Sequence, residues 1–295
     1  MRGANIYFVC MENSVKTVFF LSLLSGLLLS IGYLLGGAQG MLLGFLFSLV
    51  TNFVAYCFSD QIILAMHHAT PIERGDSRGL YVMVERLTKR AQLPMPKVYL
   101  IPDHSPNAFA TGRNPEHAAV AVTQGLLAVL NDEEVEGVLA HEIAHVKNRD
   151  TLISTIAATM ASAIMMVANM AKWAALFGGG RRSDSDENDS NPLALIAMVI
   201  VAPIAATMIQ FAISRSREFL ADETGAALTR NPRWLASALQ KIHMASGRVV
   251  ADTARIEAAH MYIMNPFSGS QILELFSTHP PVEERIDRLL KLERA

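Results

Sequence analysis

The chain has 295 residues, of which 51% are hydrophobic and only 18% are charged, and its formal net charge is -2. Soluble domains average about 45–50% hydrophobic and about 25% charged residues, so this balance indicates membrane segments. The small net charge gives no reason to expect nucleic acid as a partner. The two cysteines, Cys10 and Cys57, are too few for a disulfide framework or a thiolate metal site.

A short segment, residues 1–16, precedes a long apolar run. From residue 17 to residue 59 there are 43 positions without a charge. A straight helix of that length would extend about 65 Å, roughly twice the hydrocarbon core of a bilayer. The glycine-rich stretch 36–40 near its middle is typical of a turn. The sequence therefore predicts a transmembrane hairpin over 17–59, with helices at 17–35 and 41–59.

Residues 60–150 have ordinary polarity and read as the first part of a water-facing domain. Apolar spacing predicts a helix over 77–92, and residues 97–101 and 118–123 are typical of strands in a small sheet. A short helix is expected at 125–130. Asn131 or Asp132 would cap a longer one that runs through residue 145. The apolar positions of this last helix predict that it is buried on one side only.

That helix carries His141, Glu142 and His145 in the order His-Glu-Ile-Ala-His. Residues i and i+4 share a helix face, so the two histidines can bind one metal ion while Glu142 reaches a metal-bound water. A catalytic zinc takes three protein ligands and leaves a position for water. Glu142 would be the general base on that water and would not be a ligand. The pattern indicates a zinc hydrolase with one ion per chain.

A second apolar region occupies residues 151–214, interrupted by the polar loop 178–190. Its charge-free lengths favour a second transmembrane hairpin, although long buried helices of a soluble core would look similar. Two crossings return the chain to the side of His145. Basic residues around both hairpins favour a cytoplasmic N-terminus and domain, while Arg181 and Arg182 in the distal loop argue the other way.

The second part of the domain, residues 215–295, offers the best third metal ligand, Glu218. Asp222 follows four residues later, where it could hold a ligand imidazole in the correct tautomer. Taken alone, this spacing is usual for a solvated helix face. Further on, Pro280 and Pro281 separate His279 from a helix that contains Arg285. By sequence alone, His279 is more often a packing residue at a helix entry.

With these motifs in this order between two apolar pairs, nearly the whole chain resembles the HtpX family of membrane metalloproteases, part of the larger family that includes the CAAX prenyl protease. The resemblance implies a mainly α protein with a small β-sheet, four transmembrane helices and a zincin-like α+β catalytic domain. It also implies a multi-pass protein of the bacterial inner membrane that faces the cytosol. Its expected role is quality control under stress, with unfolded or damaged membrane proteins as substrates.

The resemblance also assigns roles to residues. His141, His145 and Glu218 would bind zinc, Glu142 would be the base, and Asp222 would support a ligand. His279 and Arg285 would stabilise the tetrahedral intermediate. Residues Asn107, Ala108, Phe109 and Ala110 resemble the edge strand on which a substrate backbone adds as a further strand.

Two other functions stay open at this point. In an intramembrane protease a transmembrane helix would itself carry the zinc pair, but the charge density around His141 disfavours a position in lipid. A non-catalytic membrane scaffold would hold a structural zinc, which usually has four protein ligands, and the sequence offers no fourth. Substrate identity and oligomeric state are not predicted.

Overall fold

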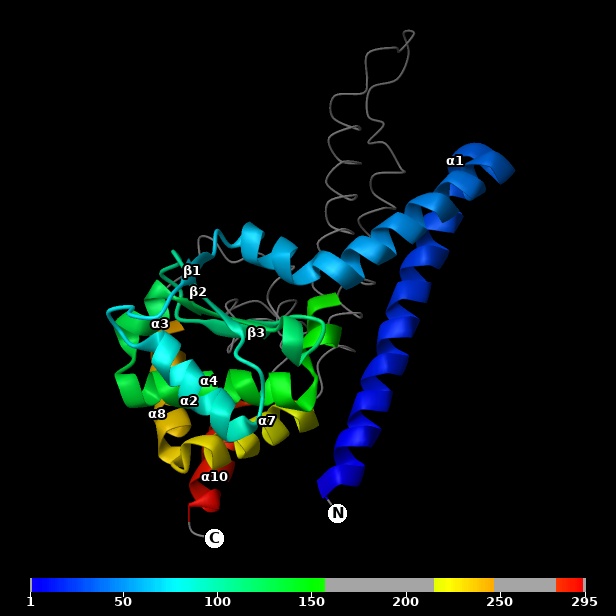
Figure 1. The fold of residues 1–295 in the computed structure, drawn as a ribbon. Coiled ribbons are helices and arrows are strands. Elements are labelled where there is room, and N and C mark those ends of the chain that lie inside the picture. The colour runs from blue at the N-terminus through cyan, green and yellow to red at the C-terminus, as the bar shows by residue number, and fades with distance from the viewer. Residues whose placement is uncertain (1, 157–214, 247–279, 294–295) are drawn as a thin grey trace, which may run out of the picture.

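The computed structural model describes residues 2–156, 215–246 and 280–293, which form a long helical arm joined to a compact body (Figure 1). The arm is α1 (Arg2–Met66). The elements of the body are, in chain order, β1 (Thr70–Ile72), α2 (Leu80–Ala91), β2 (Lys97–Ile101), β3 (Ala108–Thr111), the short 3-10 helix η1 (Pro115–His117), β4 (Ala119–Thr123), α3 (Gln124–Val129), α4 (Asp132–Asn148), α7 (Arg215–Thr229), α8 (Pro232–Ser246) and α10 (Val282–Leu292).

The arm is a helical hairpin, as the sequence predicts. Its helical geometry breaks at Gly36 and Gly37, and Gly37 has φ 58°, a left-handed value that glycine adopts at little cost. The two halves lie side by side, since the Asn52 amide donates to Ser25 Oγ at 2.8 Å and to the carbonyl of Leu21 at 3.3 Å. The predicted turn over 36–40 is too long, because the helix resumes directly after Gly37. The second half continues to Met66, beyond the predicted end at residue 59.

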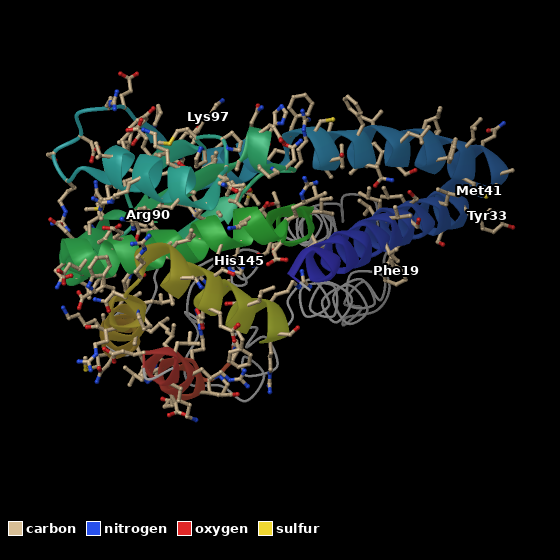
Figure 2. The ribbon with its side chains drawn as sticks, turned by 60° about the horizontal axis from the view of Figure 1, so that its bottom comes forward. Phe19, Tyr33, Met41, Arg90, Lys97 and His145 are labelled. Carbon is tan, nitrogen blue, oxygen red and sulfur yellow. The ribbon has the colours of Figure 1, made fainter. Side chains whose placement is uncertain are left out.

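Within the described part of the chain, one helix, Gly36–Phe58, has the length and apolar composition to cross a membrane. Only 11% of its most apolar window is buried, which is unlike the core helix of a soluble protein. The large apolar side chains Phe19, Tyr33 and Met41 stand on the open surface of the arm (Figure 2). The expected first span is represented only by a shorter apolar stretch, Leu21–Ser30. Of the third expected span only residues 151–156 are described, and they are helical, whereas the fourth expected span and the loop 178–190 lie outside the described residues.

The sheet has four strands in the order β1-β2-β4-β3. Strands β2 and β4, both predicted, pair in parallel, while β1 and β3 add antiparallel at the two edges. Strand β1 has three residues, one of them Pro71, and no sequence signal predicted it. Strand β3 contains three of the four residues expected to form the substrate strand, and Asn107 directly precedes it.

Side chains alternate between the two faces of the sheet, and each face has its own apolar core. Ala108 and Ala110 of β3 join the main core with the helices of the body, whereas Phe109 points to the opposite face. On that face it packs with Ile63 and Leu64 from the last turns of α1. The arm therefore ends as a cover on the outer face of the sheet.

Helix α4 is the central element of the body, lying between the sheet and helices α7 and α8 (Figure 1). Its start is fixed by a capping box in which the Asn131 side chain accepts from the Glu134 amide and the Glu134 carboxylate accepts from the Asn131 amide. The prediction that α4 is buried on one side only is wrong. Every residue from Glu134 to Ala144 is buried, because α2, α7 and α8 cover the polar face.

Candidate metal centre

The two histidines of α4 point toward the same place. His141 and His145 lie one turn apart, and their Nε2 atoms are 3.2 Å from each other. Their rings are nearly perpendicular, with centroids 4.7 Å apart, so the two nitrogens converge. His141 is 3% exposed, so this convergence takes place inside the body.

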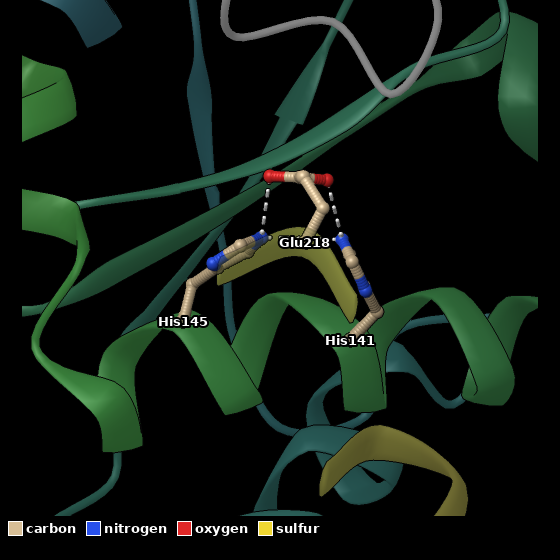
Figure 3. Close-up of side chains that lie close together, drawn as sticks. All are labelled: His141, His145 and Glu218. Carbon is tan, nitrogen blue, oxygen red and sulfur yellow. Dashed lines mark hydrogen bonds and ion pairs between the residues drawn. The ribbon is translucent and has the colours of Figure 1, made fainter. Parts of the chain in front are cut away.

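Glu218 completes the group from α7, the helix that packs against α4 (Figure 3). Its Oε2 is 3.7 Å from His141 Nε2 and its Oε1 is 3.6 Å from His145 Nε2. The three side chains each offer one ligand atom, and these atoms lie within 4.8 Å of one another. Figure 3 shows the carboxylate placed across both imidazoles.

These separations fit a tetrahedral metal ion. With metal–ligand distances of about 2.0–2.1 Å, tetrahedral ligand atoms are roughly 3.3 Å apart. The two Nε2 atoms are 3.2 Å apart, and each lies 3.6–3.7 Å from a different oxygen of the Glu218 carboxylate, which is close to that value. Two imidazoles and one carboxylate are a donor set that zinc takes in catalytic sites.

Asp222 and Arg285 support His141. The Asp222 carboxylate lies 2.9 Å from His141 Nδ1, so Nδ1–H donates to it and the lone pair of Nε2 faces the group. Arg285 donates to both oxygens of Asp222, from Nε at 2.8 Å and from Nη2 at 2.6 Å. Burial opposes the charged form of Asp222, but the guanidinium outweighs it and lowers the pKa of the carboxyl below its usual range.

Glu142 lies between the two histidines in sequence and faces the edge strand. Its Oε2 accepts from the backbone N–H of Ala110 at 2.9 Å. Burial raises the pKa of Glu142 to about 7, with the charge of His145 opposing the rise and that of Glu218 adding to it. A carboxyl with that pKa can take up and release a proton near neutral pH.

The charges around the group favour a cation. Three buried carboxylates, on Glu142, Glu218 and Asp222, interact with the guanidinium of Arg285, and a fourth, on Asp150, lies against His145. Burial opposes charging of the His145 ring. The hydrogen bond to Asp150 and the charge of Glu218 outweigh that effect and raise its pKa to about 9. A divalent ion at this point would supply the positive charge and leave the imidazole neutral.

The structure brings together most of the residues singled out from the sequence. His141, Glu142, His145, Glu218, Asp222 and Arg285 form one buried cluster, and Ala110 of the edge strand touches it. His279 lies outside the described residues. Sequence reasoning missed Asp150, whose Oδ2 is 3.3 Å from His145 Nδ1. The sequence signal that could have identified it was a carboxylate five residues after a ligand histidine, just beyond the end of the helix.

Comparisons with known proteins agree with this geometry. The sequence profile of Peptidase family M48 matches residues 76–293. A Protease HtpX homolog of Desulforapulum autotrophicum is 54% identical over 279 residues, which cover 95% of this chain and 90% of that protein. A Protease HtpX homolog of Pyrococcus furiosus is 52% identical over 278 residues, which cover 94% and 95%. The crystal structure of S. mikatae Ste24p is similar in fold, with a TM-score of 0.51 and 18% identity over 97% of this chain and 66% of that one.

Proposed function

The chain belongs to peptidase family M48 and is a membrane metalloprotease, and from this premise we propose that it is a zinc endopeptidase that cleaves misfolded or damaged membrane proteins. The observation that carries the proposal is the convergence of His141, His145 and Glu218, with Glu142 beside them. Zinc is proposed because the donor set and its spacing suit a tetrahedral ion. When bound, zinc supplies Lewis-acid chemistry that polarises a carbonyl and makes water a competent nucleophile near neutral pH.

Glu142 carries the proton transfers in the proposed reaction. The Ala110 N–H holds Oε2, so Oε1 is the oxygen that takes a proton from the attacking water and passes it to the leaving amine. Its raised pKa suits a group that must both accept and release a proton. General acid–base catalysis of this kind contributes about 10²–10⁴-fold to the rate.

Arg285 is proposed to stabilise the oxyanion that forms when water attacks. Two of its nitrogens are held by Asp222, whereas Nη1 is fully buried and has no hydrogen-bond partner among the described residues. This Nη1 lies 3.7 Å from Glu218 Oε2, next to the metal ligands. A preorganised donor at that place strengthens its interaction as negative charge develops. His279 is proposed as a second donor from the family resemblance alone.

The substrate is proposed to bind along β3. In an antiparallel pair, residues alternate between bonding the neighbouring strand and facing away from it. The Ala110 N–H faces Glu142 and is bound by it, so the outward backbone groups of β3 proposed for pairing are those of Ala108 and the carbonyl of Ala110. A peptide added at this edge would run past the base and the metal ligands. The buried side chains of Asn107 and Phe109 would support the strand, Phe109 by packing against the last turns of α1.

The protein is proposed to sit in the bacterial inner membrane with four spans and a cytoplasmic domain. The apolar arm supports membrane insertion. The basic residues that flank both expected hairpins support a cytoplasmic domain, with Arg181 and Arg182 opposing it. The metal ligands lie in the body and not in the candidate span Gly36–Phe58, which argues against an intramembrane protease. The group has three ligands among the described residues, which argues against a closed structural zinc site.

The test compares the purified protein with its Glu142→Gln variant, both loaded with zinc, on an unfolded substrate such as casein. We expect the variant to bind zinc and to cleave at least about 100-fold more slowly. Glu133→Gln is the matched control, because Glu133 is exposed on the first turn of the same helix. Equal cleavage by all three proteins, or no cleavage by zinc-loaded unmodified protein, would defeat the assignment.

A further inference from the structure

Asp150 lies against the second metal-ligating histidine, on the side away from the ligand atoms. Its Oδ2 is 3.3 Å from His145 Nδ1, and the carboxylate is only 4% exposed. We propose that Asp150 is a positioning residue for metal binding, which holds the His145 imidazole so that Nε2 faces the ion. This inference rests on the proposed zinc site, but it concerns how the ligand is held and not the reaction.

The backbone is shaped to bring this carboxylate back over the ring. On a continuous helix, a residue five positions after His145 would point about 140° away from it. Helix α4 instead ends at Asn148, and Arg149 adopts a left-handed conformation with φ 59° and ψ 36°. The Asp150 N–H then bonds the carbonyl of His145 at 3.0 Å. A left-handed residue at a helix end turns the chain sharply, and here this turn returns Asp150 to the His145 ring.

The contact determines which nitrogen is available to a metal. When Nδ1–H donates to Asp150, the lone pair is on Nε2, the atom directed at His141 Nε2 and Glu218 Oε1. His141 has the equivalent contact with Asp222. Each imidazole of the group therefore has its own carboxylate, an arrangement that fixes ring orientation and raises ligand basicity in metal sites.

The residues that directly follow Asp150 contact the end of β3, the proposed substrate strand. The next residue, Thr151, donates from Oγ1 to the carbonyl of Gly112 at 2.9 Å, and Thr155 Oγ1 lies 2.9 Å from Thr111 Oγ1. These contacts attach the helical residues 151–156 to the end of β3. The left-handed turn at Arg149 and these threonine contacts therefore fix the backbone on both sides of Asp150.

A purely structural role would be that of a helix cap, because Asp150 directly precedes residues 151–156. Asp150→Ser separates the two roles, since serine caps helices well but is too short to reach His145. Asp150→Asn keeps an acceptor oxygen at the same reach and removes the charge. Asp132→Asn is the matched control for loss of one negative charge, because Asp132 is exposed at the start of α4.

The experiment measures zinc affinity of the full-length proteins in detergent, by competition with a chromophoric chelator, and the visible spectrum of the cobalt-substituted forms. We expect Asp150→Ser to bind zinc about 10–100-fold more weakly and to show an altered cobalt spectrum. Asp150→Asn should lie between Asp150→Ser and the unmodified protein. Asp132→Asn should not differ from the unmodified protein.

The inference is overturned if the unmodified protein binds zinc and both Asp150 variants bind it equally well with an unchanged cobalt spectrum. If Asp150→Ser does not fold in the metal-free state, the result for Asp150→Asn decides. Failure of the proposed function would give a different result. If the unmodified protein binds zinc but does not cleave casein, the protease assignment fails, while the zinc affinities of the Asp150 variants still test this inference.

Discussion

Gly225 provides a sharp test of how closely the metal site depends on helix packing. It lies seven residues after Glu218, two turns along the same face of α7, where that helix crosses α4. A Cβ added at Gly225 would be 2.9 Å from the backbone nitrogen of His141 and 3.1 Å from the carbonyl carbon of Ala140. Only glycine allows the two helices to approach this closely next to a metal ligand.

We predict that Gly225→Ala weakens zinc binding and destabilises the protein. Ordinary contact begins near 3.4 Å, so α7 must move by about half an ångström. Overpacking costs about 1–3 kcal/mol, and alanine returns about 1 kcal/mol of helix propensity, which leaves a net loss of roughly 0–2 kcal/mol. The same shift moves Glu218 by more than the ~0.2 Å that metal–ligand distances tolerate. Zinc affinity should therefore fall roughly tenfold.

The assay combines chelator competition for zinc with thermal unfolding in detergent, with and without the metal. Gly26→Ala is the control, because a Cβ at that helical position meets nothing within 4 Å. We expect the control to match the unmodified protein in both measurements. A Gly225→Ala variant that keeps the original zinc affinity and unfolding temperature would show that α7 is not held as closely as the geometry implies.

Three further predictions follow from other contacts. The hydrogen bonds from Lys241 and Ser237 outweigh burial and lower the pKa of Glu134 below 4.5, so its stabilisation is present above about pH 4.5 and is lost as the pH falls through the folded-state value. Glu134→Gln should therefore lower the unfolding temperature at pH 7, and this effect should shrink as the pH falls below about 4.5 and the carboxylate becomes protonated. Arg285→Lys loses the bidentate hydrogen bonds to Asp222 and should weaken zinc binding about tenfold. Unchanged zinc binding would contradict the view that Arg285 positions His141 through Asp222. Removing zinc should lower the free energy of unfolding by about 4 kcal/mol at a zinc concentration 1,000 times the Kd, and adding it back should restore stability.

Much of the site could be predicted because its parts are local. The spacing of His141 and His145 needs only helix geometry, and the pairing of Glu218 with Asp222 repeats the same rule. Strands β2 and β4 and a cap at Asn131 or Asp132 were also predicted, and the structure has the cap at Asn131, since hydrophobic runs and capping residues act over a few positions. The hairpin of α1 followed from length and glycine content.

What could not be predicted depends on contacts between distant segments. The polar face of α4 resembles a solvated surface, yet Glu136 is buried because Arg86 of α2 contacts its carboxylate. Strand β1 is too short to have a pattern and exists because β2 offers it an edge. Asp150 reaches His145 only through the left-handed turn at Arg149, and the backbone conformation of a non-glycine residue there is not encoded by periodicity.

Helix α1 runs without a break from the candidate span to the residues that pack on the sheet, so its length fixes the distance between the two. From Phe58 to Met66 the helix rises about 12 Å, and its last turns are already packed on the strand next to the site. An extended peptide covers that distance in about four residues. If substrates leave the lipid beside α1, as the proposed membrane orientation requires, peptide bonds close to the bilayer would reach the proposed site before bonds in domains that extend far from it.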